Sequence, residues 1–597
     1  MSDDNTPKGI DSKLLRRIIS YLAPYKWLVA IAFVTVMTAA FLGPLIPKLI
    51  QVTIDRDIVS GDAAGLRRMI TILFAILVAE GTLSFINAYL TQWIGQQAIY
   101  DVRTKVYRHV QRQSLRFFDT TPIGRLITRV TSDVESLSQV LSAGVVTILG
   151  DLFKIIFISW FMFTLSWQLA LITLSVMPLM LLASFWFKKK VRHAYRDTRK
   201  QVARLNSFLQ EHVTGMRIVQ LFGREEEEMR RFEEINDDHR QAHIHTIFYY
   251  ALFFPAVDIV ATSALGLVIW YGGLVSIQGG LTLGILIAFI QYARRFFEPI
   301  RNLSDQFNTL QSAMAGAERI FGLLDSDFSI PESETPTSWR EVEGKIEFKN
   351  VWFSYDPEQD AASEDGEWIL KDVSFVVEPG QSLAIVGATG AGKTTIISLL
   401  LRFYEIQRGS IFVDGINIED LQLAELREHI GLVLQDVFLF SGSVRDNVTL
   451  RNESLADEDI KKAADAIGAS RFIEKLPEGY QQEVRERGMS LSHGQRQLLS
   501  FVRALVYNPR ILVLDEATSS VDTETEEVIQ HALETLMEGR TSIAIAHRLS
   551  TIQHADQILV MHRGRVRERG THQELIATEG LYRTLYELQY REQEVAA

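Results

Sequence analysis

The chain has 597 residues, of which 47% are hydrophobic and 22% are charged, and its formal net charge is −12. So much apolar content in so long a chain exceeds the needs of one soluble core, and we expect more than one domain. The absence of cysteine excludes disulfides and thiolate metal sites and fits an intracellular location. Lys and Arg outnumber Asp and Glu over residues 1–330, whereas the remainder is strongly acidic. This asymmetry argues against a nucleic-acid-binding protein, which would carry a basic patch or tail.

A short amphipathic helix is predicted near the N-terminus. Apolar residues recur there at helical spacing beside three basic ones: Ile10, Leu14, Leu15, Ile18, Ile19 and Leu22, with Lys13, Arg16 and Arg17. This pattern is typical of a helix that lies in the headgroup plane of a bilayer.

Six apolar stretches follow: Trp27 to Ile50, Met69 to Ile94, Val145 to Trp167, Leu169 to Phe187, Ile247 to Tyr271 and Leu281 to Phe297. A helix of ~20 residues crosses the ~30 Å hydrocarbon layer, so nearly all of them are long enough to span a membrane. A large soluble core could hold one or two such helices, but six in succession favour a membrane domain. An even number of spans places both ends of this domain on one side.

Basic residues predict the orientation. They gather before the first span, in the loop after the second (Arg103, Lys105, Arg108, Arg112 and Arg116) and in the loop after the fourth (Lys188, Lys189, Lys190, Arg192, Arg196, Arg199 and Lys200). Positive loops mark the cytoplasmic side, although Arg67 and Arg68 near the second span are exceptions. We expect a multi-pass protein of a bacterial-type inner (plasma) membrane, with the C-terminal part in the cytoplasm.

Helical periodicity continues well past the fourth span, through Val202, Leu205, Phe208, Leu209 and Val213. Helices are therefore expected to project into the cytosol. The run Glu225 to Glu228 is interpreted as an ordinary solvated helix face. Farther on, Ser326 to Arg340 is rich in Ser, Pro, Thr and Glu, which is the composition of a linker.

The last part of the chain alternates strands, loops and helices. We predict strands at Lys345 to Ser354, Ile369 to Val377, Ser382 to Val386 and Ile511 to Leu514, and a helix at Thr394 to Phe403. This alternation is typical of an α/β domain.

The segment GATGAGKTT between that third strand and the helix fits the phosphate-loop pattern G-x-x-x-x-G-K-[ST]. Its glycines let backbone N–H groups close around phosphate oxygens, while the lysine and a hydroxyl serve phosphate and Mg²⁺. A nucleoside triphosphate site is predicted at Gly387, Ala388, Thr389, Gly390, Ala391, Gly392, Lys393, Thr394 and Thr395.

A second apolar strand ends in Asp515 and Glu516, at the edge where an α/β sheet places its ligand. Phosphoryl transfer needs charge neutralisation and an oriented water more than a covalent nucleophile. We favour Glu516 as the residue that activates this water. The alternative is that Glu516 is a second acid around a metal ion.

In this order the six apolar stretches, GATGAGKTT, the string LSHGQ (Leu491 to Gln495) and ILVLDEATS resemble an ABC exporter half-transporter over nearly the whole chain. The resemblance implies a membrane α-helical domain of six transmembrane helices with an N-terminal elbow helix (residues 1–325), a linker (326–344) and an α/β P-loop ATPase domain of ABC type (345–597). It also implies ATP and Mg²⁺ as cofactors.

The resemblance gives roles to single residues. Tyr355, in FSYDP, would stack on adenine; Lys393 and the loop N–H groups would hold phosphates; Thr394 and Gln435, in LVLQD, would meet Mg²⁺; Asp515 would orient the metal shell; and His547, in AIAHRLS, would contact the γ-phosphate. Without this context, Tyr355 would be a packing aromatic and His547 a core histidine with a satisfied hydrogen bond.

The family signature is LSGGQ, but this chain has His493 at the third position. Ser492, His493, Gly494 and Gln495 would close over ATP held by another subunit, and Asp522, in SSVD, would cross the same interface. His493 is either a tolerated variation or the altered signature found in subunits of heterodimeric exporters that keep the catalytic glutamate. We predict a second half-transporter as partner in a heterodimer with one competent ATP site, and a homodimer is the alternative.

Two loops resemble the coupling loops of the family, namely Phe117 to Val134 and Val213 to Glu225. The second would dock on the partner's nucleotide-binding domain. ATP-driven closure of two such domains would turn the spans from inward to outward opening.

The substrate is predicted least sharply. Glu80, Asp258, Arg294 and Arg295 lie in or near spans and are functional candidates because isolated charge is costly in hydrocarbon, although a structural role fits the two arginines equally well. Aromatic residues of the last two spans could line an apolar cavity or serve helix packing. Three functions are compatible: an ATP-driven exporter of hydrophobic or amphipathic drugs or lipids, a flippase for lipids or lipid-linked precursors, and an ATP-gated channel or regulatory subunit.

Overall fold

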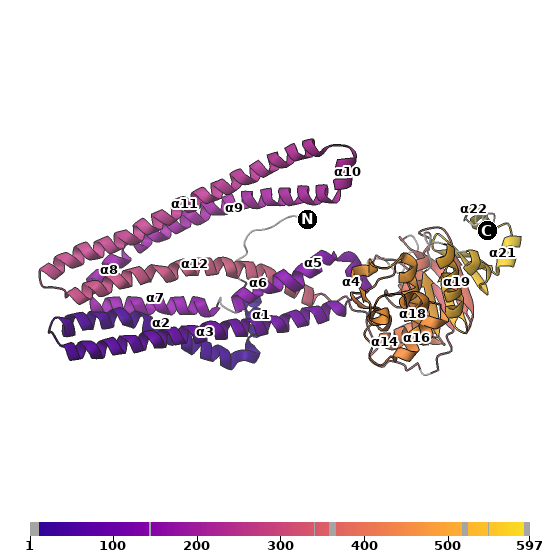
Figure 1. Ribbon diagram of the computed structural model, residues 1–597, viewed down its shortest axis with the longest axis horizontal. Coiled ribbons are helices and arrows are strands. Elements are labelled where there is room, and N and C mark those ends of the chain that lie inside the picture. Colours follow the sequence, from indigo (N-terminus) through magenta and orange to yellow (C-terminus); the bar gives the residue numbers. More distant parts are fainter. Residues whose placement is uncertain are drawn as a thin grey trace. The chain divides into compact units, whose positions relative to one another are not determined.

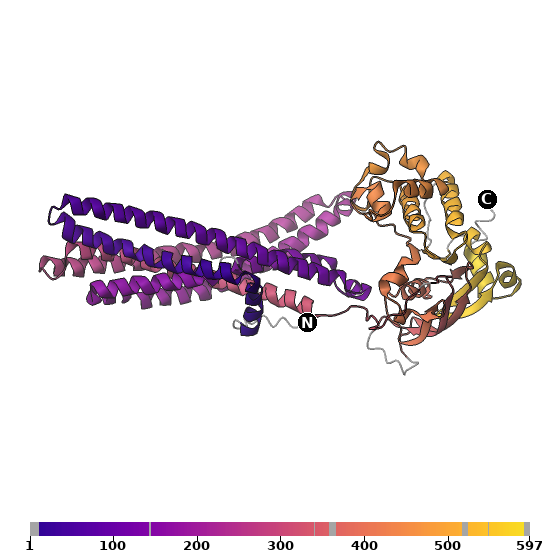
Figure 2. The same ribbon diagram turned by 90° about the horizontal axis from the view of Figure 1, so that it is seen from below.

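The computed structural model describes residues 11–141, 145–339, 341–356, 366–515, 523–546 and 549–589. Its contacts divide the chain into two compact units (Figures 1 and 2). The helical unit comprises residues 1–111 and 123–326, and the α/β unit comprises 112–122 and 327–597. The short segment 112–122, which interrupts the helical unit in the sequence, thus belongs to the α/β unit by its contacts.

The helical unit consists of α1 (Ser12–Ser20), α2 (Lys26–Val52), α3 (Ala63–Gln111), α5 (Ile123–Thr128), α6 (Val134–Gln139), α7 (Val145–Leu165), α8 (Trp167–Leu174), α9 (Met177–Thr214), α10 (Met216–Leu221), α11 (Glu225–Ile277) and α12 (Leu283–Asp325). Among the described residues, five helical stretches are long and apolar enough to cross a membrane. They contain five of the six predicted spans. The sixth is the start of α12, where Arg294, Arg295 and Glu298 interrupt the apolar run.

Two long helices, α9 and α11, run side by side and carry the short α10 at their common end (Figures 1 and 2). α2 packs on α3 and α7, and α12 packs on α2, α7 and α11. The core between these helices is aromatic, since Phe289, Tyr292 and Phe296 of α12 are fully buried. These three predicted cavity candidates therefore serve helix packing within the chain, whereas Phe248 and Trp270 of α11 are exposed.

Two prolines inside α2 shape its contact with α12. Pro47 has no N–H, so the carbonyl of Gly43 loses its intrahelical donor. Arg295 Nη1 donates to that carbonyl at 2.8 Å, and the Tyr292 hydroxyl donates to the carbonyl of Pro44 at 2.7 Å. Arg295 thus has the structural role that the sequence left open.

The predicted fourth span is not one helix. α8 ends at Leu174 and α9 begins at Met177, with Pro178 in its first turn. The first turn of a helix tolerates proline because its N–H groups lack intrahelical partners. The apolar run was continuous in sequence, so hydropathy alone did not indicate the break.

The predicted N-terminal helix is confirmed as α1. Asp11 caps it by accepting a hydrogen bond from the Lys13 N–H. Arg17 binds the Asp325 carboxylate through two nitrogens, at 2.6 and 2.7 Å, and its guanidinium lies 4.2 Å from the centre of the Phe321 ring. These contacts fasten α1 to the end of α12.

The α/β unit has twelve strands in the described residues: β1 (Ile346–Phe353), β2 (Leu370–Val377), β3 (Ser382–Val386), β4 (Arg408–Val413), β5 (Ile416–Asn417), β6 (Ile430–Val433), β7 (Gly442–Ser443), β8 (Glu483–Val484), β9 (Ile511–Asp515), β10 (Thr541–Ile545), β11 (Gln557–His562) and β12 (Arg565–Gly570). The main sheet has the order β12-β11-β3-β10-β9-β6, and a smaller antiparallel sheet has the order β2-β1-β4-β5.

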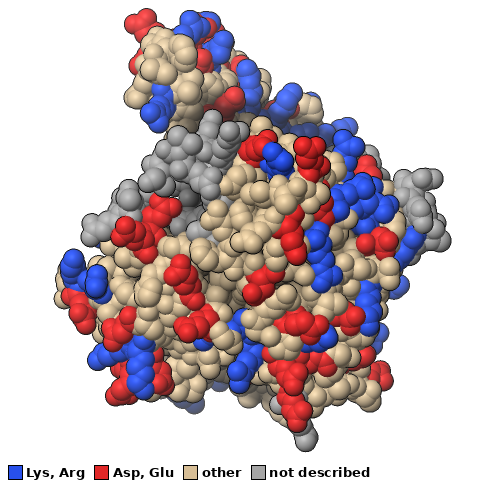
Figure 3. Space-filling view, turned by 90° about the vertical axis from the view of Figure 1, so that its right-hand side faces the viewer, with Lys and Arg blue, Asp and Glu red and all other residues tan. Residues whose placement is uncertain are grey.

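The helices of this unit are α4 (Leu115–Thr120), α13 (Lys393–Leu400), α14 (Leu423–Glu428), α15 (Val444–Thr449), α16 (Asp457–Ala466), α17 (Ser470–Ile473), α18 (His493–Val506), α19 (Thr523–Met537), α20 (Leu549–Gln553), α21 (His572–Ala577) and α22 (Leu581–Gln589). α13 is buried in a core formed with both sheets, and α15, α16, α18 and α19 share a second core. Acidic and basic side chains are interspersed over the face drawn in Figure 3.

The predicted linker is packed on the α/β unit. The Trp339 side chain is 2% exposed, and its indole N–H donates to Asp414 Oδ2 at 2.9 Å. Asp414 also accepts from the N–H groups of residues 343–345. Arg402, which is buried, donates to the carbonyl of Pro331 at 2.6 Å. The polar composition of this segment correctly indicated a lack of regular secondary structure, but it gave no sign of this anchoring.

Helix α4 is fixed to the same unit at several points. The Ser114 N–H donates to the carbonyl of Phe328 at 3.0 Å, and the Phe117 ring packs on the Phe328 ring. The Tyr404 hydroxyl donates to Asp119 Oδ2. The beginning of the first predicted coupling loop therefore contacts the α/β unit of its own chain.

Candidate nucleotide-binding site

The candidate site lies where four neighbouring strands of the main sheet end. β3, β10, β9 and β6 are parallel, and their register pairs Ile545 with both Ile385 and Asp515. The phosphate loop follows β3, Asp515 ends β9, and Gln435 follows β6. The carboxyl ends of parallel strands share one edge, so the sheet brings together residues far apart in the sequence.

The phosphate loop depends on glycines with positive φ. Gly390 has φ +79° and Gly392, directly before α13, has φ +99°. A Cβ atom on Gly392 would lie 2.6 Å from Leu370 Cδ2, and one on Gly387 would collide with the carbonyl of Met561. The backbone therefore passes where side chains do not fit, and a phosphate can approach its N–H groups closely.

Lys393 is folded back over the loop. Its Nζ donates to the carbonyls of Gly387 at 2.7 Å and Ala388 at 3.2 Å. Burial lowers the pKa of Lys393, and the negative charge of Asp515 partly offsets that effect. The ammonium group is thus held inside the phosphate loop, opposite the acidic end of β9.

Three predicted oxygen donors lie on the segments that meet at this sheet edge. Thr394 and Gln435 are exposed, and Asp515 is half-buried. A hydroxyl, an amide oxygen and a carboxylate suit Mg²⁺, which binds few protein ligands and completes its shell with water and substrate phosphates. The residues present fit Mg²⁺.

Tyr355 stands beside the start of α13. Its hydroxyl and that of Thr395 are hydrogen-bonded at 3.2 Å, while 45% of the residue surface is exposed. The rings of Phe353 and Tyr404 contact Tyr355 edge-on, with centroids 4.9 and 5.1 Å away. An aromatic ring with this much exposed surface can stack on a base. Thr395 itself is buried and supports Tyr355.

The signature string begins α18. Ser492 is its N-cap, and Ser492 and Gln495 form a reciprocal capping box: the Ser492 hydroxyl accepts from the Gln495 N–H at 3.2 Å, and Gln495 Oε1 accepts from the Ser492 N–H at 2.9 Å. His493 is half-buried and Gly494 is buried. The S-x-x-Q spacing could have indicated this cap from the sequence.

Three predicted site residues, Glu516, Asp522 and His547, lie outside the described residues. The strands that precede them are described: β9 ends at Asp515, and β10 ends at Ile545. The roles of all three stay predictions.

Of the charged residues in predicted spans, Glu80 and Arg295 come close to one glycine. A Cβ atom on Gly43 would lie 2.8 Å from Glu80 Oε1 and 3.8 Å from Arg295 Nη1. Asp258 and Arg294 are exposed. Glu80 and Arg295 therefore both approach Gly43 of α2 within the helical unit.

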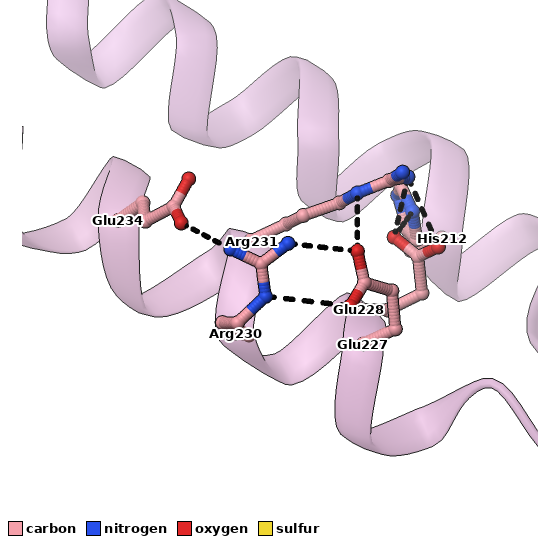
Figure 4. A network of polar contacts seen from close by, with 6 residues as sticks. All are labelled: His212, Glu227, Glu228, Arg230, Arg231 and Glu234. Atoms are coloured by element: carbon pink, nitrogen blue, oxygen red, sulfur yellow. Dashed lines mark hydrogen bonds and ion pairs between the residues drawn. The ribbon is translucent and has the colours of Figure 1, made fainter.

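The prediction of a solvated glutamate run is correct for Glu225 and Glu226, which are exposed, but wrong for the next two. Glu227 pairs with Arg230, and Glu228 pairs with His212 (Figure 4). This network was not predicted from the sequence, although the i,i+3 spacing of Glu227 and Arg230 is a signal for it. The paired contacts of Arg319 with Asp133 were not predicted either.

Comparison with known proteins agrees with both units. The family model for the ABC transporter transmembrane region matches residues 29–300, and the ABC transporter model matches residues 370–519. An uncharacterized ABC transporter ATP-binding protein of Bacillus subtilis, YknV, is 39% identical over 99% of this chain and 96% of its own length.

Two further relatives carry more specific names. An ATP-dependent lipid A-core flippase of Desulfotalea psychrophila is 37% identical over 97% of this chain and all of its own length. A probable multidrug resistance ABC transporter ATP-binding/permease protein of Bacillus subtilis, YheH, is 37% identical over 88% of this chain and 77% of its own length. The chain belongs to the ABC transporters, as an exporter-type half-transporter with a transmembrane region and an ATP-binding domain in one polypeptide, and it is an ATPase coupled to transmembrane transport.

Proposed function

We propose that the chain moves hydrophobic or amphipathic substrates, drugs or lipids, outward from the cytoplasm or the inner leaflet of a bacterial-type inner membrane by alternating access. The observation that carries this proposal is the joining of a phosphate loop, with Lys393 folded into it, to a unit of long apolar helices. The basic loops between the spans support a cytoplasmic location of the α/β unit.

The proposed chemistry uses the residues of the candidate site. Tyr355 stacks on adenine, and Lys393 and the loop N–H groups bind the phosphates. Thr394, Gln435 and Asp515 would hold Mg²⁺, which would supply charge neutralisation at the phosphates. Glu516 orients the attacking water, and His547 contacts the γ-phosphate. Charge neutralisation and positioning account for most of the acceleration in phosphoryl transfer.

The partner is a second half-transporter, and a heterodimer accounts best for His493. Ser492, His493, Gly494 and Gln495 of one subunit close over ATP bound by the other. An imidazole where a glycine allows close approach leaves the partner's ATP site impaired, whereas this chain's own site receives the partner's signature. The substitution His493→Gly, made in the chain expressed alone, tests whether the bulk of the imidazole impairs the ATP site. Homodimer ATPase activity should rise several-fold, and unchanged activity would contradict it.

Transport is tested with inside-out vesicles that contain the chain with and without its partner. ATP-dependent uptake of a cationic dye supports drug export, and uptake of a labelled lipid supports a flippase. The flippase is the second candidate because a relative with that name matches along nearly the whole chain. ATP-gated leak of both probes down their gradients, without accumulation, would contradict an exporter and indicate a channel.

A further inference from the structure

The cytoplasmic end of the α9–α11 pair is held by a network of charged side chains that the activity described above does not use. α9 ends at Thr214, α10 spans Met216–Leu221, and α11 begins at Glu225. The network joins the last turn of α9 to the first turns of α11 (Figure 4). It lies far beyond the apolar stretch of α9, which ends at Phe187, and so outside the membrane.

Of the six residues drawn in Figure 4, His212 alone lies on α9. Its Nδ1 lies 2.9 Å from the carbonyl oxygen of Phe208, and its Nε2 lies 2.8 Å from Glu228 Oε2. A carbonyl and a carboxylate both only accept hydrogen bonds, so both ring nitrogens must donate. An imidazole with two N–H groups is the cationic form. The geometry therefore describes a charged His212 that bridges two helices.

The partners of Glu228 are fixed in turn. Arg231 Nη1 lies 3.2 Å from Glu228 Oε1, and Arg231 Nε lies 3.5 Å from Glu227 Oε1. Arg230 then joins Glu227 at 2.8 Å and Glu234 at 2.6 Å. These charges stiffen the start of α11, and only the bond from Glu228 to His212 carries the network across to α9.

Helix α10 needs such support because it has no core of its own. None of its residues is buried, and Ile218 and Leu221 are 58% and 73% exposed. Six residues are too few for a stable helix by themselves. Its orientation must come from the two helix ends that flank it, which are the ends that His212 and Glu228 join.

We propose that protonated His212 is a positioning residue that, through Glu228, holds α10 in the orientation needed to couple ATP hydrolysis to transport. This proposal rests on the proposed export function. The hydrogen bond to Phe208, together with Glu228 and Glu211, raises the pKa of His212. Glu211 on α9 and Glu228 on α11 are the charged groups that act on the ring, and Arg231 and Glu227 lie behind Glu228.

The raised pKa of His212 determines on which side of neutrality the bridge is lost. A raised pKa in the folded state means that the bridge is complete below the ordinary histidine pKa of ~6.5 and is lost as pH rises through the raised value. The orientation of α10 should therefore loosen on the alkaline side of neutrality.

A distance measurement tests the bridge between His212 and Glu228 without requiring transport. The chain has no cysteine, so spin labels can be placed on Asn206→Cys of α9 and Gln220→Cys of α10, both exposed positions. In the full-length protein in lipid, the distance distribution should be narrow at pH 6 and broaden by pH 8.5. His212→Gln and Glu228→Gln should be broad at both pH values. A narrow distribution in both variants, or no pH response in the parent, would overturn the proposal.

A matched control is available on the same helix. His193 and Asp197 also form a histidine–carboxylate pair, at 3.0 Å, but both lie on α9 and are largely exposed. His193→Gln should leave the distance distribution and its pH response unchanged. If His193→Gln broadened the distance distribution as much as His212→Gln, any histidine on α9 would have this effect. That result would contradict a specific role of the His212–Glu228 bridge.

The coupling role has a separate readout. Substrate moved per ATP hydrolysed should fall roughly two- to fivefold in His212→Gln, the range expected for loss of one partly exposed ion pair, and should no longer vary with pH. Unchanged coupling would overturn the coupling role. If the distance response is present but no variant or parent moves any substrate, the export function fails and the coupling role fails with it.

Discussion

The hydroxyl of Tyr404 donates a hydrogen bond to the carboxylate of Asp119, and the Tyr404 ring packs edge-on against Tyr355. Asp119 belongs to α4, in the loop between the second and third predicted spans, and Tyr355 is the proposed adenine platform. Two side-chain contacts thus connect the candidate ATP site to α4, which the contacts of the chain assign to the α/β unit.

Tyr404→Phe is expected to weaken coupling and spare ATP binding. The substitution removes the hydroxyl that binds Asp119, and one such hydrogen bond contributes about 1 kcal/mol at a partly exposed site. It keeps the ring against Tyr355. Burial and Asp119 raise the pKa of Tyr404, so the hydroxyl stays a donor at neutral pH. Transport per ATP should fall severalfold in vesicles. The control Tyr404→Ala should also weaken ATP affinity, and equal coupling in Tyr404→Phe and the parent would contradict this link.

Gly392→Ala is expected to abolish tight ATP binding. The residue has φ +99°, and its Cβ would lie 2.6 Å from Leu370 Cδ2, so strain and a collision add in the phosphate loop. Gly380 is the matched control, because its φ is +75° with nothing within 4 Å of the added atom. Gly380→Ala should cost about 1 kcal/mol of stability and leave ATP affinity unchanged. Binding of a fluorescent ATP analogue measures the ATP affinity of both variants. Normal binding by Gly392→Ala would show that the phosphate loop does not require glycine at this position.

Trp339→Ala is expected to destabilise the α/β unit by about 3–5 kcal/mol, the usual cost of truncating a buried tryptophan. Trp339→Phe retains most of the packing and loses the bond to Asp414, so it should cost much less. Thermal unfolding and protease sensitivity of residues 327–345 in the full chain provide the measurement. If the linker were only a flexible spacer, it would tolerate both substitutions. Equal stability of the parent, Trp339→Ala and Trp339→Phe would therefore contradict the anchoring role of Trp339.

Acid should release α1 from α12. The hydrogen bonds from Arg17 lower the pKa of Asp325, so this pairing is complete above the ordinary aspartate pKa of ~3.9 and is lost as pH falls through the lower folded value. Spin labels on Lys13→Cys and Gly322→Cys should report a fixed distance at pH 7 and a broad one at strongly acidic pH.

In the same labelled protein, Arg17→Gln should be broad at every pH. Arg16→Gln is the control, because Arg16 is an exposed neighbour on α1, and it should behave as the parent. If Arg17→Gln kept the narrow distance at pH 7, the pair would not be what fastens α1.

The sequence predicted most accurately what depends on local pattern. β3 was placed at Ser382–Val386 as observed, and the phosphate loop lies between it and α13 because motif, strand and helix are adjacent in the chain. The position of Asp515 at the sheet edge also followed, since parallel strands share one edge for their carboxyl ends. Gln435 was expected only from the family resemblance, because no strand was predicted before it.

Contacts between residues distant in sequence could not be predicted. Hydropathy averages over a window, so it missed the break before Pro178. Composition classed residues 326–340 as a spacer because nothing local reveals that Trp339 meets Asp414. The pairing of His212 with Glu228 likewise depends on α9 and α11 turning back on each other through α10.

ATP hydrolysis and substrate uptake, measured together in one vesicle preparation for the parent and for Glu516→Gln with the partner subunit present, test the central claim most directly. Replacing the group that activates the water should slow hydrolysis by about 10²-fold or more, leave ATP binding intact and stop uptake. A Glu516→Gln protein that hydrolyses ATP and accumulates substrate as fast as the parent would contradict ATP-driven export at this site.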